Sequence, residues 1–593
     1  MISDKPVRWS LKDLMAEPVD QALEQTFSDL DQASAGFEAM RDLLVPEIST
    51  KSFNDILDQI EAINALMSRL EAFADLWLTE DTQHAEALNL RDRVDRALTE
   101  SSNRMVFFDI WFKGLADEPA HRLIDASGKR HYFLEGMRKL TPYTLTEREE
   151  KLINLKDVNG IDALTNLYDM ITNQFAFTLK PDDETLSLTR DQVGGYFRHP
   201  SPIVREAAYR ELYRVYEENA QVLAQIYLHR VRDWNAEGVE LRGYASAISA
   251  RNLGNDLPDA VVDVLLEVCR KNVGLFQRYF EMKKRWLRLE NFRRYDIYAP
   301  LLESDKSYTH GEAVQMVLDS YDAFSSKAAS LARKVLEKGH LDSETRPRKR
   351  GGAFCYGPLP GITPWVMLNY EGRARDVATL AHELGHAIHN MLAGKHSILT
   401  YSPSLPLAET ASVFAEFQLI DQLLKQETNP AVRRDLLAYS IDDAYVTVIR
   451  QAYFTLFERE AFRVIDEGGS VEDLTELYME NLKEQFGEAV EITEMFKWEW
   501  LTVPHLFNAP FYTYAYSFGQ LLVLALVQQY RREGESFVPK YLRLLSYGGS
   551  EPPMKILEEA GIDPTVPAFW RGGFNVIQGM IEELDETSKE MSS

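Results

Sequence analysis

Long stretches of this chain repeat apolar side chains at steps of three and four residues, the spacing of one face of an α-helix. Segment 201–234 shows the pattern, with a stripe of Val204, Ala208, Leu212, Val215, Val222 and Ile226. Similar stripes cover residues 52–78, 256–288, 311–337, 432–464 and 515–531. Helix-breaking residues separate them, at 199–202, 254–259 and 346–352. The pattern predicts a mainly α protein with many helices.

Length and charge narrow the class of protein further. At 593 residues the chain exceeds what one core can hold, so we expect several subdomains. The net charge is −27, and so acidic a chain lacks the cationic footprint that binding to nucleic acids or anionic membranes requires. No run of 18 or more apolar residues occurs. We therefore expect no nucleic-acid partner and no membrane-spanning segment.

Cysteine usage points to a reducing compartment. Cys269 and Cys355 are the only cysteines, which excludes a disulfide framework and a thiolate-rich metal site. The first residues lack the apolar segment of a signal peptide. Both features favour a cytoplasmic location. We interpret Cys355 as small buried filler rather than as an oxidation-sensitive thiol.

One segment departs from the helical pattern. In residues 351–372, glycines and prolines bracket the apolar run Trp365, Val366, Met367 and Leu368, which predicts a short buried or half-buried strand. An exposed strand edge pairs with an extended peptide through backbone hydrogen bonds, largely regardless of side chains. We therefore interpret this strand as a place for a peptide substrate.

The segment "DVATLAHELGHAIHN", residues 376–390, carries the candidate chemistry. His382 and His386 are four residues apart, so on a helix they share one face. Two imidazoles so placed can hold one zinc ion, and Glu383 beside them is placed to accept a proton from water. Chance predicts on the order of 0.02 His-Glu-x-x-His matches in a chain with 12 histidines. The alternative of hydrogen-bonded core histidines is therefore disfavoured.

A third ligand is expected from a following helix. Residues 402–424 begin a helix after prolines and offer Glu409. Its small neighbours would let this helix approach the first one closely; they are Ala408, Thr410, Ala411 and Ser412. Glu416 lies on the same face two turns later, where it can orient a histidine by accepting its hydrogen bond.

His389 needs a separate interpretation. It follows His382 by seven residues, roughly 10 Å along a helix axis. One metal ion cannot bridge that distance, so we interpret His389 as a packing residue or an outer hydrogen-bonding partner of the site.

The motifs "TLAHELGHAIH" and "AETASVFAE" together resemble the thimet oligopeptidase/oligoendopeptidase F family of zinc metallopeptidases, above all its oligoendopeptidase F branch. Residues 242–266, 350–357, 504–520 and 541–563 are similar to that branch as well. The resemblance is good over about 200–575, looser over 100–200 and faint before that. It implies a mainly α, multi-helix, two-lobed protein with a deep substrate channel and a small β-sheet next to the zinc helix.

The resemblance also implies roles for residues at matching positions. His382, His386 and Glu409 match the ligands of one Zn²⁺ per chain, and Glu383 matches the general base and acid. Gly352 and Ala353, with the strand at 365–368, match the region that holds the substrate backbone.

A histidine and tyrosines on a loop that faces the metal in the family match His505, Tyr512 and Tyr514. Donors aimed at the carbonyl oxygen of the substrate would stabilise the negative charge that develops there. Loop length differs between branches, so the sequence leaves open which tyrosine does so.

These inferences together predict an endopeptidase that uses zinc to cleave oligopeptides. The expected domains are an N-terminal helical region over 1–195, a catalytic domain over 196–580 and a disordered tail over 581–593. The nearest alternative is a zinc carboxypeptidase or dipeptidyl carboxypeptidase of similar fold. Another is a non-catalytic helical scaffold that keeps the metal for stability. The sequence leaves open whether the protein is a monomer or a homodimer.

Overall fold

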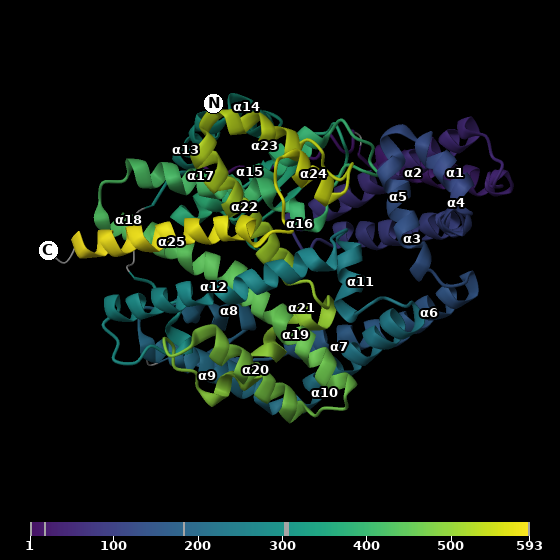
Figure 1. Ribbon diagram of the computed structural model, residues 1–593. Helices are drawn as coiled ribbons and strands as arrows, with labels where there is room; N and C mark the ends of the chain where they lie inside the picture. Colours follow the sequence, from purple (N-terminus) through teal and green to yellow (C-terminus); the bar gives the residue numbers. More distant parts are fainter. Residues whose placement is uncertain (1–2, 17–18, 182–183, 302–306, 591–593) are drawn as a thin grey trace. The chain divides into compact units, whose positions relative to one another are not determined.

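The fold is known from a computed structural model that describes residues 3–16, 19–181, 184–301 and 307–590. Helices dominate it, as Figure 1 shows, and the described strands form one two-stranded and one three-stranded sheet. The expectation of a mainly α protein with a small sheet is therefore confirmed.

The chain divides into two compact units, neither of which is continuous in sequence. The first unit comprises Met1–Thr144, Lys306–Leu423 and Gln529–Ile562, and the second comprises Leu145–Asp305, Leu424–Gln528 and Asp563–Ser593. The predicted boundary between residues 195 and 196 lies inside the second unit. The predicted extent of the catalytic domain stays a prediction.

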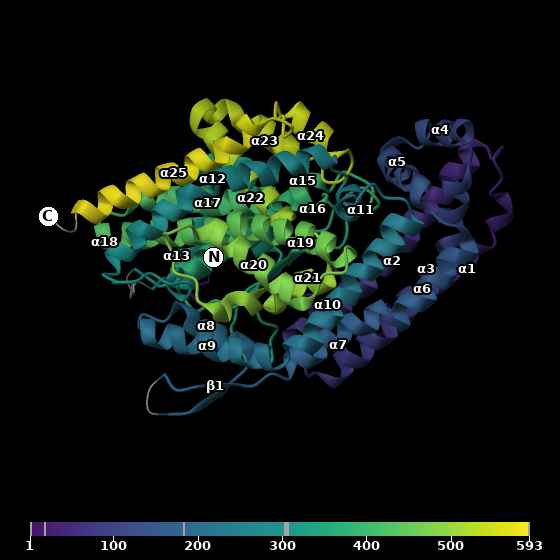
Figure 2. The same cartoon turned by 60° about the horizontal axis from the view of Figure 1, so that its bottom comes forward.

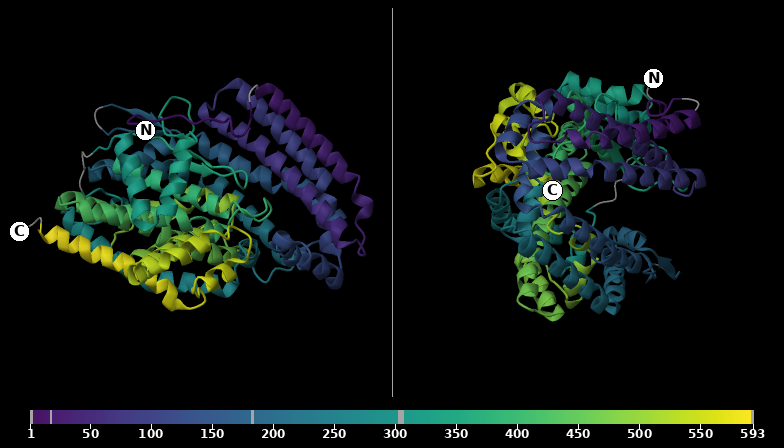
Figure 3. Two further views of the ribbon diagram at one scale, coloured as in Figure 1. Left: turned by 90° about the horizontal axis from the view of Figure 1, so that it is seen from above. Right: turned by 90° about the vertical axis from the view of Figure 1, so that its right-hand side faces the viewer.

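Three long helices dominate the N-terminal part of the first unit. They are α1 (Val19–Glu38), α2 (Thr50–Glu80) and α3 (Ala85–Gly114), which pack side by side, as the left view in Figure 3 shows. The side chain of Ser49 caps α2 by accepting the amide hydrogen of Ser52. Phe53, Leu57 and Ile60 then bury one face of α2 at helical spacing.

The other helices that lie wholly or mainly in the first unit are α4 (Asp117–Asp125), α5 (His131–Lys139), α13 (His310–Phe324), α14 (Ser326–Glu337), α15 (Ala374–Ala393), α16 (Leu405–Ala408), α17 (Thr410–Gln426), α23 (Val538–Leu545) and α24 (Pro553–Glu559).

The three-stranded sheet of this unit has the order β3 (Leu341–Asp342), β5 (Trp365–Met367), β4 (Phe354–Tyr356). β3 is parallel and β4 antiparallel to the central β5. All three β5 residues are fully buried, and the Trp365 ring stacks on His340 with 4.0 Å between centroids. The strand predicted from the apolar run is thus present, and β4 and β5 both pack on α15.

The second unit contains α9 (Pro202–Glu218), α10 (Ala220–Trp234), α12 (Asp259–Trp286) and α18 (Pro430–Ala444) as its main frame. A short antiparallel hairpin of β1 (Phe177–Leu179) and β2 (Leu186–Leu188) packs on α9 through β1, as Figure 2 shows. The other helices that lie wholly or mainly in this unit are α6 (Glu147–Asn159), α7 (Ile161–Asn173), α8 (Arg190–Gly195), α11 (Ala247–Gly254), α19 (Gln451–Asp466), α20 (Val471–Phe486), α21 (Pro504–Asn508), α22 (Tyr514–Glu533) and α25 (Pro567–Glu590).

Three of the predicted helical stripes are interrupted in the structure. Asn219 separates α9 from α10, where its amide donates back to the Val215 carbonyl over 2.9 Å. Ser325 separates α13 from α14 in an extended conformation, and its side chain caps the second helix. A π-helical segment, Tyr445–Arg450, links α18 to α19. Apolar periodicity continues through each break, so it does not reveal them.

The C-terminal helix corrects the prediction of a disordered tail. α25 runs to Glu590 and lies along α12 and α18, as Figure 1 shows. Ile581 and Leu584 are fully buried, so apolar packing holds residues that a polar composition led us to expect frayed. Residues 591–593 of the predicted tail lie outside the described residues.

Two smaller expectations concern cysteines and membranes. Both cysteines are free thiols, with Cys269 buried in α12 and Cys355 half-buried in β4. None of the helices in the described part of the chain combines the length and apolar character needed to cross a bilayer.

Candidate metal centre

The helix predicted around the two histidines is α15, and its start is well defined. The Asp376 carboxylate accepts the amide hydrogens of Glu371 and Arg373 over 2.9 and 3.0 Å, which satisfies donors at the helix start. His382, Glu383 and His386 then fall in the middle of α15, where the backbone is fully hydrogen-bonded. The two imidazoles share one face of the helix.

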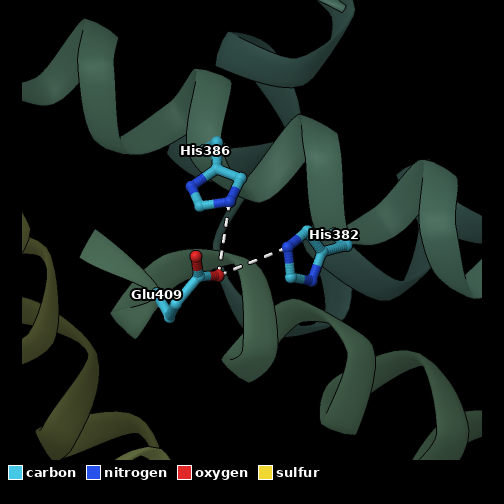
Figure 4. Close-up of side chains that lie close together, drawn as sticks. All are labelled: His382, His386 and Glu409. Atoms are coloured by element: carbon cyan, nitrogen blue, oxygen red, sulfur yellow. Dashed lines mark ion pairs between the residues drawn. The ribbon is translucent and has the colours of Figure 1, made fainter. Parts of the chain in front are cut away.

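Glu409 lies at the junction between α16 and α17, rather than inside one helix as expected. Its Oε2 is 3.3 Å from Nε2 of His382 and 3.4 Å from Nε2 of His386. Figure 4 shows this one carboxylate oxygen facing a ring nitrogen of each histidine. One ligand atom from each of the three residues lies within 4.8 Å of the others, so the structure brings the predicted ligand set together.

The hydroxyl of Ser412 helps to fix Glu409. Ser412 Oγ lies 2.7 Å from Glu409 Oε2, to which it donates. α17 can carry these groups so close to α15 because position 385 is glycine. A Cβ on Gly385 would lie 2.7 Å from the carbonyl oxygen of Ala411 and 2.7 Å from Cα of Ser412. The close helix approach predicted from the small residues is therefore present.

Glu416 lies where the sequence predicts a hydrogen-bond acceptor. Its Oε1 is 2.9 Å from Nδ1 of His382. A hydrogen on Nδ1 that is donated to Glu416 leaves the lone pair of Nε2 pointing toward Glu409, which is the tautomer a metal ligand needs.

The charges of these groups are strongly coupled. Burial alone would lower the pKa of His382, but hydrogen bonds with Glu409 and Glu416 raise it well above its usual value. Burial would likewise raise the pKa of Glu409, yet hydrogen bonds with His382 and His386 hold it far below normal. The carboxylates of Glu409 and Glu416 therefore favour a positive charge beside them, which a proton on His382 supplies here and a bound metal ion would supply in its place.

His389 lies inside the protein, one turn after His386, and its predicted role as a packing residue or outer hydrogen-bonding partner stays a prediction. It is buried, and its ring is hydrogen-bonded to the backbone of Ala408, the residue before Glu409. Burial, with the nearby His386, lowers its pKa to about 4, so it is neutral at physiological pH. The bond ties α15 to the end of α16.

Glu383 is the other buried group of the motif. Burial raises its pKa, although the two neighbouring imidazoles oppose this shift. The turn before it is fixed by Tyr321 of α13, whose hydroxyl donates to the Ala381 carbonyl over 2.6 Å.

The interpretation of residues 365–368 as the substrate edge is wrong. β5 is hydrogen-bonded on both sides, and Trp365, Val366, Met367 and Leu368 are buried, so this strand has no edge to offer. Among the described residues, β3 and β4 are the edge strands beside it, and β4 follows Gly352 and Ala353. Gly352 has a φ of +78°, a left-handed conformation that suits glycine.

The second unit contains the predicted histidine and tyrosines, and it places the two tyrosines differently. The His505 ring stacks on Tyr512, with 5.4 Å between centroids, and its Nε2 is 3.2 Å from the hydroxyl of Tyr516. Tyr514 is fully buried, and its hydroxyl accepts a hydrogen bond from Asn255 over 2.8 Å. The hydroxyl of Tyr514 is therefore tied to Asn255 inside this unit, and its role in catalysis stays a prediction.

Tyr516 also lies beside His505, although the sequence analysis did not single it out. Tyr512 and Tyr516 are four residues apart at the start of α22, a spacing that places side chains on the same face of a helix. Tyr514 falls between them and points elsewhere.

The profile of Peptidase family M3 matches residues 196–576. The chain is 25% identical over 589 residues to the oligopeptidase PepF of Bacillus subtilis, covering 98% of this chain and 87% of that protein. It is 26% identical to an oligoendopeptidase F homolog of Borreliella burgdorferi, covering 97% of each. The crystal structure of oligoendopeptidase-F from Enterococcus faecium has the same fold, with a TM-score of 0.73 and 23% identity over 96% of this chain and 99% of that one. The chain therefore belongs to peptidase family M3 and is a metalloendopeptidase.

Proposed function

We propose that the protein is a zinc-dependent endopeptidase of short peptides, with His382, His386 and Glu409 as the zinc ligands. The observation that carries this is the position of Glu409 Oε2, 3.3 and 3.4 Å from the two Nε2 atoms. Donors that bind zinc tetrahedrally at about 2.0–2.1 Å lie about 3.4 Å from one another, so the separations fit. Two imidazoles and one carboxylate leave one coordination position open, as in catalytic zinc sites.

Bound zinc would supply a water molecule with a pKa of about 7 and would polarise the carbonyl of the bond to be cleaved. Glu383 takes the proton of the attacking water and later delivers it to the nitrogen of the leaving amine. Its raised pKa suits this exchange, because a carboxyl that is less acidic than usual holds the proton long enough to pass it on. Glu416 and Ser412 keep His382 and Glu409 in their binding orientation.

The histidine and tyrosine group of the second unit has a proposed role of its own. We assign His505, Tyr512 and Tyr516 to the stabilisation of the carbonyl oxygen, which each good donor stabilises by about 2.7–4 kcal/mol in the transition state. The family resemblance supports this role for His505 and Tyr512, and the contact between His505 and Tyr516 supports the choice of Tyr516 over Tyr514.

The substrate backbone is assigned to the edge of β4. β4 packs on the metal-binding helix and has its other side paired with β5, and backbone pairing would accept many peptide sequences. Peptides that carry N-methyl groups on the paired amides should bind with a higher KM than their parent peptides, while kcat changes less. Equal KM values for every N-methyl position would contradict this assignment.

The central test is the variant Glu383→Gln. It should retain zinc, measured by elemental analysis, and lose nearly all cleavage of a peptide blocked at both ends. Cleavage of the blocked peptide by the wild-type protein identifies an endopeptidase, whereas a carboxypeptidase would leave it intact. Full activity of the variant would refute the role of Glu383. The cytoplasmic location and the oligomeric state stay predictions.

A further inference from the structure

The peptide group between Pro510 and Phe511, just before Tyr512, is hydrogen-bonded through both its oxygen and its nitrogen. In the second unit, Nε of Arg251 donates to the carbonyl oxygen of Pro510 over 3.0 Å. Glu458 Oε1 accepts the amide hydrogen of Phe511 over 2.8 Å. These two backbone atoms belong to the same peptide group, so a guanidinium from α11 and a carboxyl from α19 hold one amide between them.

Phe511, which follows this doubly bonded peptide group, has a strained backbone. Phe511 has a φ of +57°, a left-handed conformation that residues other than glycine rarely adopt. Such strain persists only where the surroundings over-determine it. The Phe511 ring also packs on Phe462, with 4.6 Å between centroids. The backbone therefore enters Tyr512 in a conformation that the loop would not adopt by itself.

Among the residues that follow, Thr513, Tyr514 and Ser517 are anchored by side-chain hydrogen bonds. The hydroxyls of Thr513 and Thr455 are hydrogen-bonded over 2.8 Å, and Tyr514 is bonded to Asn255 as described. Ser517 Oγ donates to the Val448 carbonyl over 2.7 Å. Tyr512 and Tyr516 remain half-buried beside His505.

Burying the carboxyl of Glu458 to accept the Phe511 amide hydrogen carries a desolvation cost. The side chain of Glu458 is fully buried, and its Oε2 has no hydrogen-bond partner within the described part of the chain. Burial raises its pKa to about 8. An apolar residue would avoid the cost of desolvating a carboxyl, but it would leave the buried amide of Phe511 without an acceptor, so the hydrogen bond to this amide accounts for the carboxyl at position 458.

We propose that Arg251 and Glu458 are positioning residues, which hold the Pro510–Phe511 peptide group so that Tyr512 and Tyr516 are set against His505. This inference rests on the proposed role of His505 and the two tyrosines in cleavage. Neither Arg251 nor Glu458 touches the substrate in it. Their effect reaches the reaction through the loop.

Three variants test the proposal with a blocked fluorogenic peptide. Glu458→Ala removes the acceptor and should lower kcat by between about tenfold and a hundredfold with little change in KM, because small misplacements of donors cost that much. Glu458→Gln keeps an oxygen for the Phe511 amide and should restore most of kcat. Ile465→Ala opens a cavity elsewhere on α19, since Ile465 is also buried, and should leave kcat near the wild-type value.

Zinc content and melting temperature are measured for each variant. Equal losses of kcat in Glu458→Ala and Ile465→Ala, or no rescue by Glu458→Gln, would overturn the proposal. If Glu458→Ala does not fold, Arg251→Met tests the hydrogen bond to the Pro510 carbonyl instead. It should show the same fall in kcat at unchanged KM.

A double variant separates this inference from the proposed function. Tyr516→Phe should cost less kcat in the Glu458→Ala background than in the wild type, because the tyrosine is already misplaced there. Full activity of Tyr516→Phe alone would refute the role of the tyrosine. A low activity of Tyr516→Phe together with full activity of Glu458→Ala would refute the positioning role and leave the proposed function intact.

Discussion

Gly385 and Ser412 meet where α15 crosses α17, and the contact leaves no room for a side chain at position 385. A Cβ there would lie 2.7 Å from Cα of Ser412, closer than such atoms can approach. Gly385→Ala should therefore push α17 away from α15 and draw Glu409 off the two histidines. We expect zinc occupancy and activity to fall together, as measured by elemental analysis after dialysis.

The control for this prediction is Gly36→Ala in α1, another helical glycine. A Cβ at Gly36 meets no atom within 4 Å, so this substitution should leave zinc bound. Full zinc occupancy in Gly385→Ala would show that α15 and α17 can accommodate the extra methyl group without moving Glu409.

Glu416 should control how tightly zinc is held, although it is not a ligand. Glu416→Ala removes the acceptor for Nδ1 of His382, which then loses its fixed tautomer and orientation. Zinc affinity should drop by about 10–100-fold in a competition titration with a chromogenic chelator. Asp421→Asn, on the same helix and paired with Arg531, is the control and should leave the affinity unchanged. Equal zinc affinities in the two variants would show that Glu416 does not contribute to zinc binding.

Tyr516 and Tyr514 offer a matched pair of hydroxyl deletions. Tyr516→Phe should lower kcat by about 10²–10³ if its hydroxyl stabilises the transition state. Tyr514→Phe loses the hydrogen bond with Asn255 and should lower the melting temperature, because it leaves a buried donor unpaired, with a smaller effect on kcat. The reverse order of the two kcat values would restore the role that the sequence first gave to Tyr514.

The parts of the site that the sequence predicted are those set by local spacing. His382 and His386 share a helix face whatever the rest of the chain does, and the small residues around Glu409 already indicated a close helix approach. The third ligand nevertheless lies at a helix junction, which the apolar pattern around it does not show. Predictions that depended only on the helical repeat therefore identified helices correctly, although they did not locate every helix end.

The errors arose where long-range packing decides. Trp365–Met367 was correctly predicted as a strand, but strand order is set by pairing partners distant in sequence, and β5 is central. In the sequence Tyr514 resembles Tyr512 and Tyr516. In the structure its hydroxyl accepts a hydrogen bond from Asn255, a residue distant in sequence. The polar residues after 580 gave no sign of the helices that bury Ile581.

Glu458 should give the protein a stability that depends on pH. Its pKa rises from the usual 4.5 to about 8 in the folded chain, mainly through burial, against the opposing effects of the Phe511 amide and Arg251. Between these values the folded protein keeps a proton that the unfolded chain has released. The contribution of this group to the free energy of unfolding therefore decreases as pH rises, by about 1.4 kcal/mol per pH unit, and levels off above about pH 8.

Glu458→Gln cannot titrate at this position, so it isolates the effect. The melting temperature of the variant minus that of the wild type should increase steadily from pH 5 to about pH 8, at one scan rate and one zinc concentration. Glu460→Gln, which removes an exposed carboxylate from the same helix, serves as the control for the loss of one charge. A constant difference between Glu458→Gln and the wild type across this range would mean that Glu458 is ionised in the folded protein throughout. In that case the Phe511 amide and Arg251 would stabilise the carboxylate more than burial destabilises it.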